Sequence, residues 1–392
     1  MEATARPALR KTAGTFEAGA RTLPQRYFVS SEVMAEEEKE IFLKHWLLVG
    51  HQSRIPKAGD YFVQETAGES VIIARDRSGV IRGFYNVCRH RGTRLCEDSG
   101  GHSSTIQCPY HAWTYGLDGR LIGSPHMDDV PGFDRSQYSL HPANLELWEG
   151  FIFVKLGDDD MPLEQWFAPL AGKFSNWNLP RLRSVKRVEY DVKANWKLMF
   201  ENYSECYHCP GVHPMLSKVS PYDSAENDLT EGPFLGGFMR INKGKSLTMS
   251  GEACALRIDH EQELAAASPS GGGHERKGEE QVFYYSIFPN MLLSMHPEYV
   301  MVHQLWPQAP DRTLIVCDWF FHPEAAERDD FNPEDAIEFW DVTNKQDWHV
   351  CELSQQGIAS RAYEPGPYSS RESIAAAWDR EYLKILGRPT ER

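Results

Sequence analysis

The first part of the chain is a series of short apolar runs separated by turn residues. The runs are rich in β-branched and aromatic residues, which is typical of antiparallel strands joined by hairpins. They lie at Tyr61–Val63, Val71–Ala74, Val80–Tyr85 and Phe151–Val154. Before them, residues 1–30 have the composition of a flexible arm. Residues 30–46 place apolar side chains at helical spacing and predict a short amphipathic helix.

The second part alternates helical and strand-like patterns. Strands are predicted at residues 185–192, 281–288, 291–295, 299–306 and 313–321, and the last four suit an antiparallel meander. Helices are predicted at residues 161–174, 196–206, 333–354 and 371–386. The third of these opens on Asn332-Pro333, a favourable pair for a helix start. Residues 265–280 contain Ser-Pro-Ser-Gly-Gly-Gly and predict a mobile surface loop.

Length and composition agree with a globular protein of two domains. The 392 residues are 41% hydrophobic and 25% charged, and the net charge is −15. This charge makes nucleic acid and anionic membrane surfaces unsuitable partners and accommodates a small cationic molecule or a basic protein. The acidic balance can equally serve only to keep the protein in solution. Residues 1–25 lack the apolar core of a signal peptide, and no window reaches the ~18 apolar residues of a membrane span. We therefore expect a cytoplasmic protein with reduced cysteines.

Two Cys-His pairs indicate a metal cluster. Cys88-Arg89-His90 is followed after 17 residues by Cys108-Pro-Tyr-His111, so one pair has the spacing C-x-H and the other C-x-x-H. Two thiolates and two imidazoles fit either a tetrahedral zinc ion or a Rieske [2Fe–2S] cluster, in which histidine replaces cysteine on one iron. Because each pair offers one Cys and one His, the spacing favours the Rieske cluster.

A second constellation lies further along the chain. His208 and His213 flank Pro210-Gly211, and Asp347 lies on a mostly uncharged face of the long predicted helix. Two histidines and one carboxylate form the facial triad of non-haem Fe(II) oxygenases. The pattern Cys206-Tyr-His-Cys209 also permits a redox or zinc motif. We give that alternative little weight because no second pair of cysteines accompanies it, and small buried cysteines explain the pattern.

These motifs resemble those of a known family. The series C-x-H…C-x-x-H, then N-W-K…E-N-x-x-E-x-Y-H…H and later N-x-x-D-W, is similar to the large (alpha) subunit of Rieske non-haem iron oxygenases. The resemblance implies an α+β fold, with an antiparallel β Rieske domain (residues 46–157) and a helix-covered antiparallel-sheet catalytic domain (158–392). An N-terminal arm and helix (1–45) would pack with the catalytic domain.

The resemblance also assigns roles to individual residues. It implies that Cys88, His90, Cys108 and His111 bind the [2Fe–2S] cluster, and that His208, His213 and Asp347 bind mononuclear Fe(II). Glu205 would link a cluster histidine of a neighbouring subunit to His208, and Asn202 would support the iron site from outside its ligands. The implied assembly is a homotrimer that receives electrons, ultimately from NADH or NADPH, through a separate flavin/iron-sulfur reductase. The basic residues Arg89, Arg91 and Arg94 are candidates for reductase docking, although an ordinary solvated surface explains them equally well.

The substrate follows from a narrower resemblance. Glu205, where ring-hydroxylating members usually have Asp, and the Cys-Tyr-His-Cys-Pro-Gly-Val-His context are similar to the branch that oxidises quaternary ammonium compounds. We therefore expect hydroxylation of an N-methyl group of a betaine-like substrate, such as glycine betaine, proline betaine, carnitine or choline. One alternative is a Rieske oxygenase for aromatic or other apolar substrates. A second is a Rieske electron carrier without oxygenase activity.

The sequence does not identify the residues of the substrate pocket. A quaternary ammonium ion calls for aromatic faces, because it cannot donate a hydrogen bond through nitrogen. Five aromatic residues lie on predicted strands of the second domain, and most of them are expected in the core: Tyr284, Tyr285, Tyr299, Trp306 and Trp319.

Overall fold

The chain forms two compact units in a computed structural model that describes residues 8–157, 161–255 and 280–389. One unit combines the described residues up to Ile41 with those from Ala168 onward, and the other is the continuous segment Phe42–Phe167. The divisions therefore fall at residues 41 and 167, where the sequence predicted 45 and 157. Near the second division, Trp46 Nε1 and Lys155 Nζ both donate to the carbonyl of Met161. These two hydrogen bonds attach Met161 to the smaller unit. The loop predicted at residues 265–280 lies outside the described residues, except for Glu280.

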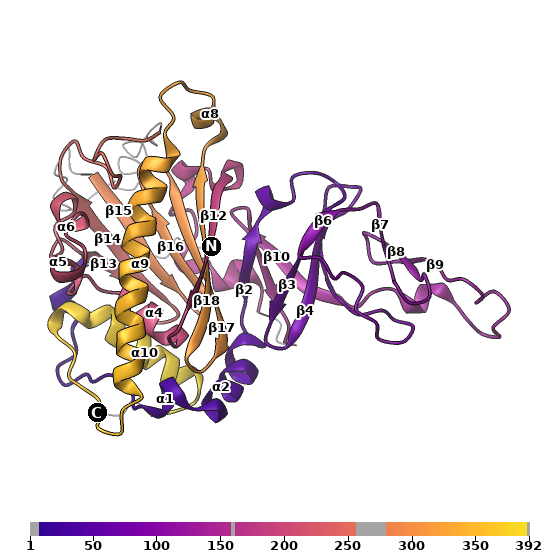
Figure 1. The fold of residues 1–392 in the computed structure, drawn as a ribbon, viewed down its shortest axis with the longest axis horizontal. Helices are drawn as coiled ribbons and strands as arrows, with labels where there is room; N and C mark the ends of the chain where they lie inside the picture. The colour runs from indigo at the N-terminus through magenta and orange to yellow at the C-terminus, as the bar shows by residue number, and fades with distance from the viewer. Residues whose placement is uncertain (1–7, 158–160, 256–279, 390–392) are drawn as a thin grey trace. The chain divides into compact units, whose positions relative to one another are not determined.

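The smaller unit is an antiparallel β domain, as predicted. Its larger sheet has the order β2-β11-β10-β5-β4-β3-β6, and β7, β8 and β9 form a second sheet of three strands (Figure 1). The bounds are β2 Leu47–His51, β3 Asp60–Thr66, β4 Glu69–Arg75, β5 Ile81–Tyr85, β6 Gly100–His102, β7 Thr105–Gln107, β8 Thr114–Gly116, β9 Leu121–Gly123, β10 Pro142–Trp148 and β11 Phe151–Lys155.

The helix predicted at residues 161–174 is wrong in its extent. Helix α3 covers only Leu163–Trp166, and a separate 3-10 turn follows at Ala168–Leu170. Pro169 explains the break, because proline has no N–H to continue the helical hydrogen bonds and its ring disfavours a helical conformation in the residue before it.

The larger unit contains an eight-stranded antiparallel sheet with the order β1-β13-β14-β15-β16-β17-β18-β12. The bounds are β1 Arg10–Lys11, β12 Arg183–Val192, β13 Glu226–Leu229, β14 Phe234–Ile241, β15 Glu280–Ile287, β16 Met291–Met295, β17 Val300–Ala309 and β18 Arg312–Phe321. The five strands predicted here are confirmed, and β1, β13 and β14 were not predicted. Strand β14 was not predicted because Gly236-Gly237 interrupts its apolar pattern, and glycine weakens the pattern typical of a strand.

These two glycines are required by the sheet itself. A Cβ atom at Gly236 would lie 2.0 Å from the carbonyl oxygen of Tyr284, and one at Gly237 would lie 2.0 Å from that of Glu226. Gly236 also has a φ of +143°, which L side chains rarely adopt. The glycines therefore permit close approach of the neighbouring strands.

Helices cover one face of this sheet. Helix α9 (Pro333–Ile358) lies over the sheet, and α4 (Trp196–Tyr203) and α10 (Ser373–Ile385) pack against each other beside it (Figure 1). Helix α4 ends at Tyr203 rather than at residue 206, and α9 continues one turn past the predicted end. None of the helices within the described ranges combines the length and apolarity needed to cross a bilayer.

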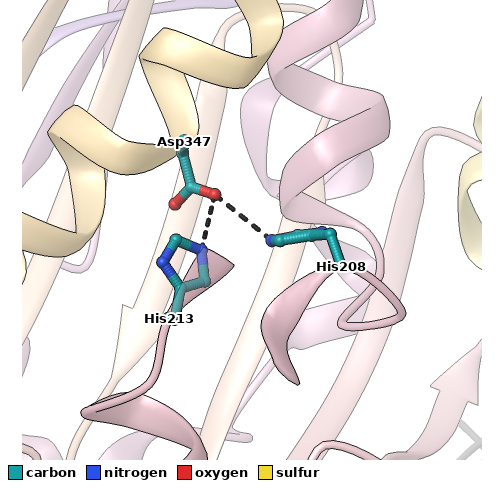
Figure 2. Close-up of side chains that lie close together, drawn as sticks. All are labelled: His208, His213 and Asp347. Carbon is teal, nitrogen blue, oxygen red and sulfur yellow. Dashed lines mark hydrogen bonds and ion pairs between the residues drawn. The ribbon is translucent and has the colours of Figure 1, made fainter. Parts of the chain in front are cut away.

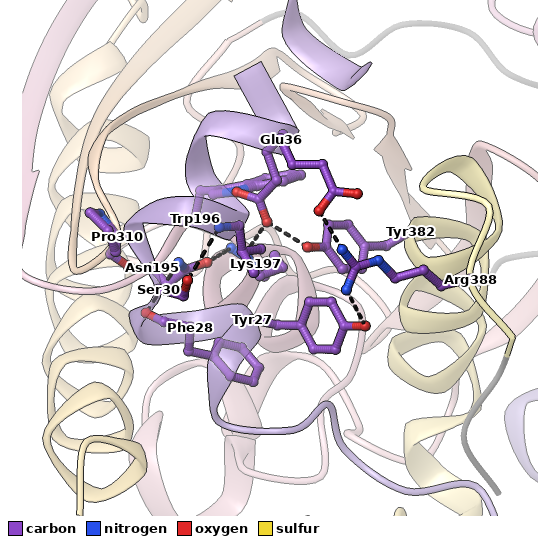
Figure 3. A network of polar contacts seen from close by, with 12 residues as sticks. Tyr27, Phe28, Ser30, Glu36, Asn195, Trp196, Lys197, Pro310, Tyr382 and Arg388 are labelled. Atoms are coloured by element: carbon purple, nitrogen blue, oxygen red, sulfur yellow. Dashed lines mark hydrogen bonds and ion pairs between the residues drawn. The ribbon is translucent and has the colours of Figure 1, made fainter. Parts of the chain in front are cut away.

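The segment expected to be a flexible arm is built into the larger unit from residue 8 onward. Its strand β1 pairs with β13, and its short helices α1 (Arg26–Val29) and α2 (Ser31–Glu37) contact α4 and α10 through polar groups (Figure 3). The buried carboxylate of Glu37 accepts hydrogen bonds from Lys197 Nζ at 2.5 Å and from Tyr382 Oη at 2.5 Å. This buried ion pair fixes the arm, because either charge would be costly without the other. The predicted helix at 30–46 is shorter than expected and ends in a wider turn at Glu38–Phe42.

Candidate metal centres and catalytic cavity

The two Cys-His pairs lie in two matching loops of the smaller unit. In the first loop, Cys88 N donates to Thr93 O, and Gly92 N donates to Cys88 O. In the second, Cys108 N donates to Trp113 O, and Ala112 N donates to Cys108 O. The loops therefore share one backbone pattern, although their ligand spacings differ. Each places its fourth residue after the cysteine at positive φ, 75° for Gly92 and 57° for Ala112.

The side chains of these loops are poised for a cluster. Cys88 and Cys108 are unpaired thiols and buried, and the rings of His90 and His111 lie 4.7 Å apart. The ring of His90 stacks on Trp113 at 4.8 Å. Burial, His111 and Arg91 lower the pKa of His90, which keeps it in the neutral form that binds metal.

Tyr115 is a further residue of this site that the sequence analysis did not identify. Its hydroxyl lies 3.4 Å from Cys88 Sγ and accepts a hydrogen bond from Arg89 N at 3.0 Å. It is fully buried on β8, seven residues after Cys108. Hydrogen bonds to cluster sulfurs tune the reduction potential, so Tyr115 is placed to adjust it.

A compact group of ligands lies in the larger unit. His208, His213 and Asp347 offer ligand atoms that all lie within 4.8 Å of one another, and both imidazoles face the carboxylate (Figure 2). Asp347 Oδ1 is 3.2 Å from His208 Nε2 and 2.8 Å from His213 Nε2. His208 and His213 flank the short helix α5 (Cys209–Val212), and Asp347 comes from α9. Within the described ranges, this is the one such group suited to a single ion.

Each histidine of this triad is oriented through its other nitrogen. His208 Nδ1 lies 2.5 Å from Glu205 Oε1, and His213 Nδ1 donates to Gln346 Oε1 at 2.8 Å. Metal-binding histidines typically bind through one nitrogen while the other N–H is held by a carboxylate or carbonyl. Both Nε2 atoms are thereby directed toward the position that a metal would occupy. Gln346 was missed by the sequence analysis, although it directly precedes Asp347.

Protonation in the metal-free triad follows from its geometry. Burial opposes the charged form of His208, but hydrogen bonds with Asp347 and Glu205 outweigh burial and raise its pKa to about 10. Burial likewise opposes ionisation of Asp347, yet His208 and His213 lower its pKa. A divalent metal bound by these three side chains would displace the proton of His208, because metal-binding imidazoles are neutral. Two imidazoles and one carboxylate, with no further protein ligand in the group, fit a non-haem Fe(II) ion with open positions.

Cys206 and Cys209 form a disulfide, contrary to our expectation of reduced, small buried cysteines. The turn Tyr207-His208 between them brings their Cα atoms to 5.0 Å, within the range that a disulfide spans. The disulfide therefore encloses His208 in a closed loop of four residues.

A cavity of about 380 Å³ opens onto the triad. It is lined by α4 and the following loop, by strands β14, β15 and β17, and by one face of α9. Asn202, proposed to support the iron site, lines this cavity, as do Glu205 and Tyr284. The other four aromatic residues singled out in the sequence (Tyr285, Tyr299, Trp306 and Trp319) are buried in the core. Trp340, His303 and Trp348 line the cavity and were not identified, because strand and helix contribute to one wall only in the folded chain.

Comparison with known proteins identifies both units. Residues 45–134 match the Rieske [2Fe-2S] domain, and residues 179–388 match the catalytic domain of the ring hydroxylating alpha subunit. The chain is 31% identical to the glycine betaine monooxygenase oxygenase subunit of Chromohalobacter salexigens, over 90% of this chain and 82% of that protein. It is 30% identical to the carnitine monooxygenase oxygenase subunit of Acinetobacter baumannii, over 87% and 86%.

A solved structure gives the same result for the fold. A quaternary ammonium Rieske monooxygenase, described with carnitine oxidation and inter-subunit electron transfer, is 26% identical and matches with a TM-score of 0.79. The match covers 96% of this chain and 100% of that one. The α+β fold, the [2Fe–2S] and non-haem iron cofactors and the oxidoreductase class are thus confirmed. The chain belongs to the Rieske non-haem iron oxygenases, as a large (alpha) oxygenase subunit.

Proposed function

We propose that the chain is the oxygenase component of a monooxygenase that hydroxylates an N-methyl group of a quaternary ammonium substrate. The observation that carries this proposal is the opening of the triad onto a cavity with an aromatic wall. The similar proteins are named for glycine betaine, carnitine and choline, which are all quaternary ammonium compounds. The alternative of a pure electron carrier is set aside, because the chain includes the catalytic domain of the family.

The aromatic wall is a continuous series of five rings that begins and ends on α9. Along the series Trp340, Tyr284, Tyr203, His303 and Trp348, successive ring centroids are 6.4, 5.8, 6.4 and 5.8 Å apart. A quaternary ammonium ion offers no N–H, so its recognition depends on cation–π contact with such faces and on shape. This wall supplies the faces close to the triad.

The metal ligands follow from the two sites. His208, His213 and Asp347 would hold Fe(II), and Cys88, His90, Cys108 and His111 would hold the [2Fe–2S] cluster. Iron at the triad, when bound, supplies the activation of O2. The overall reaction consumes the substrate, O2, two electrons and two protons and forms the N-hydroxymethyl cation and water. That hemiaminal then releases formaldehyde and a proton, leaving the demethylated amine.

Glu205 is proposed as the link for electron transfer. Its carboxylate holds Nδ1 of His208 and accepts from the backbone N–H of Tyr207 and His208, so it is fixed beside the triad. In a homotrimer it would meet a cluster histidine of the neighbouring subunit, as the inter-subunit electron transfer described for the solved relative suggests. Electrons would come from NADH or NADPH through a separate flavin/iron-sulfur reductase. We place the protein in the cytoplasm, where NADH and NADPH are available.

Activity assays of the purified protein with a surrogate reductase test the proposal. O2 uptake and formaldehyde release are measured with glycine betaine, proline betaine, carnitine and choline, and arene hydroxylation is measured in parallel. We expect formaldehyde from at least one quaternary ammonium compound in step with O2 uptake. Hydroxylation of an arene without formaldehyde from any of these compounds would replace the proposal by the apolar-substrate alternative.

A further inference from the structure

Two side chains of the cavity wall have polar atoms without partners. His303 on β17 is 1% exposed, and neither of its ring nitrogens has a partner in hydrogen-bonding geometry, although the side chain of Asn344 is close enough to affect its pKa. Trp348 on α9 is 6% exposed, and its Nε1–H also lacks a partner. Both residues line the cavity, with ring centroids 5.8 Å apart and ring planes nearly perpendicular. Buried polar atoms in native proteins nearly always have a partner, which can be a ligand or an ordered water molecule.

Two neighbouring rings of the wall, Tyr203 and Trp340, differ in this respect. Tyr203 Oη donates to Leu293 O at 2.8 Å, and Trp340 Nε1 donates to Tyr299 Oη at 2.6 Å. Their polar atoms are committed to the protein, so only their ring faces are offered to a ligand. His303 and Trp348 offer hydrogen-bond donors in addition to ring faces.

The side chain of His303 is uncharged. Burial lowers the pKa of His303 to about 4 against the opposing effects of Asn344 and Asp347, so the imidazole is uncharged near neutral pH. An uncharged donor does not repel a quaternary ammonium ion. Of the described lysine and arginine residues, Lys11 and Arg371 line the cavity, and both are exposed. Arg371 lies over the ring of Tyr222, which is itself 37% exposed.

We propose that His303 and Trp348 form a two-donor subsite for the carboxylate of a short betaine, an inference that rests on the proposed function. The quaternary nitrogen cannot use these donors, whereas a carboxylate accepts from both. Because the zwitterion as a whole carries no net charge, it can bind inside the cavity without a cationic side chain beside it. The subsite would make the cavity select a betaine over a tetraalkylammonium ion of similar size.

Equilibrium binding to the holoenzyme without O2 tests the subsite. Calorimetry measures the dissociation constants of glycine betaine, choline and tetramethylammonium for the wild type and for His303→Phe and Trp348→Phe. Both variants keep a ring and remove the donors. A hydrogen bond to a charged group contributes enough to change affinity about tenfold or more. We expect each variant to weaken glycine betaine binding at least tenfold and to change tetramethylammonium binding less than about twofold.

Matched variants separate the possible outcomes. Trp340→Phe removes an indole N–H of the same wall that is bonded within the protein, so it should not discriminate between the two ligands. Equal weakening of both ligands by His303→Phe and Trp348→Phe would overturn the subsite and indicate that the donors hold only water or packing. Selective loss of glycine betaine with Arg371→Gln alone would also overturn it and place the carboxylate at the exposed arginine. A choline affinity reduced as strongly as that of glycine betaine would show that a hydroxyl group, rather than a carboxylate, is recognised.

The experiments distinguish a failure of the subsite from a failure of the proposed function. If the wild type releases formaldehyde from glycine betaine and the variants bind it unchanged, the subsite is wrong and the function stands. If the wild type binds none of the quaternary ammonium compounds and releases no formaldehyde from them, the function itself is wrong. The visible spectrum of the cluster and circular dichroism confirm that each variant is folded.

Discussion

The Nδ1 atom of His213 lies 2.8 Å from Oε1 of Gln346, the residue directly before Asp347 on α9. One helix therefore supplies both a proposed metal ligand and the group that orients a second proposed ligand. Glu205 holds His208 in the corresponding way from the loop after α4. The triad is thus fixed from two elements that are far apart in the sequence.

Replacing Gln346 by Leu should weaken iron binding at the triad without affecting the cluster. Loss of a group that orients a ligand typically reduces metal affinity 10–100-fold, because the imidazole becomes free to rotate. Iron content after dialysis against a graded chelator measures the change. Gln356→Leu, an exposed glutamine of the same helix, is the matched control. An unchanged iron affinity in Gln346→Leu would show that the contact with His213 is incidental.

Replacing Asp347 by Ala should remove the mononuclear iron and abolish substrate-dependent O2 uptake. The visible spectrum of the cluster should remain, because its proposed ligands lie in the other unit. Iron analysis, O2 consumption and absorbance are measured on one preparation. Glu338→Ala changes an exposed acid of the same helix and should retain activity. O2 uptake that persists in Asp347→Ala would rule out the triad as the iron site.

Replacing Glu205 by Gln should slow electron transfer while both metal sites stay loaded. Glutamine can still accept from His208 Nδ1, but it lacks the negative charge that stabilises the imidazole, so we expect turnover to fall about 10–100-fold. Stopped-flow absorbance follows reoxidation of the reduced cluster with O2 and substrate. Asp223→Asn, an exposed acid lining the same cavity, is the control. Reoxidation at the rate of the wild type would exclude Glu205 from the electron path.

Replacing Tyr115 by Phe should lower the reduction potential of the cluster. The phenol beside Cys88 Sγ stabilises the additional negative charge of the reduced form. A hydrogen bond worth about 0.5–1.5 kcal/mol corresponds to roughly 20–60 mV for one electron. A spectroscopic redox titration measures the shift. Tyr110→Phe, at a 57% exposed tyrosine of the second Cys-His loop, should leave the potential unchanged. An equal potential in Tyr115→Phe and the wild type would disprove the contribution.

Replacing Asp379 by Asn should stabilise the protein at alkaline pH. Burial raises the pKa of Asp379 to about 7 despite the hydrogen bond from Tyr368, and the buried Glu201 faces it. Because the pKa is higher in the folded state than the ~3.9 of an unfolded chain, stability is lost as pH rises from about 4 to about 7. Asparagine stays uncharged, so Tm at pH 8 should rise by at least about 2–4 °C, the shift that ~1 kcal/mol produces.

Thermal melts at pH 5 and pH 8 test this expectation. At pH 5, where Asp379 is largely protonated in the folded protein, the variant and the wild type should differ less. Asp311→Asn, an exposed acid of the same unit, should show no such pH-dependent difference. A variant that melts below the wild type at both pH values would contradict the assignment of a destabilising charge.

Local patterns were sufficient to predict most elements and both candidate ligand sets. The regular apolar runs predicted the strands from β15 to β18, and the turn residues between the candidate ligands marked their loops. Strand β14 was missed because its glycines serve the approach of neighbouring strands, a need that arises only in the sheet. His303 and Trp348 were missed for a related reason, since 45 residues separate them in the sequence and only the packing of α9 on β17 makes them neighbours. The Cys206–Cys209 disulfide was misjudged because the spacing alone does not show how tightly the turn folds.

The contact between Glu37 and Tyr382 has a consequence for the order of events during synthesis. The two residues are 345 positions apart, so at 5–20 residues per second Glu37 waits roughly 20–70 s for this partner. The smaller unit is continuous in sequence and can fold long before that, whereas the larger unit needs both its early and its late segments. The smaller unit, which would accept electrons, should therefore fold on the ribosome while the larger unit, which would activate oxygen, is still incompletely folded.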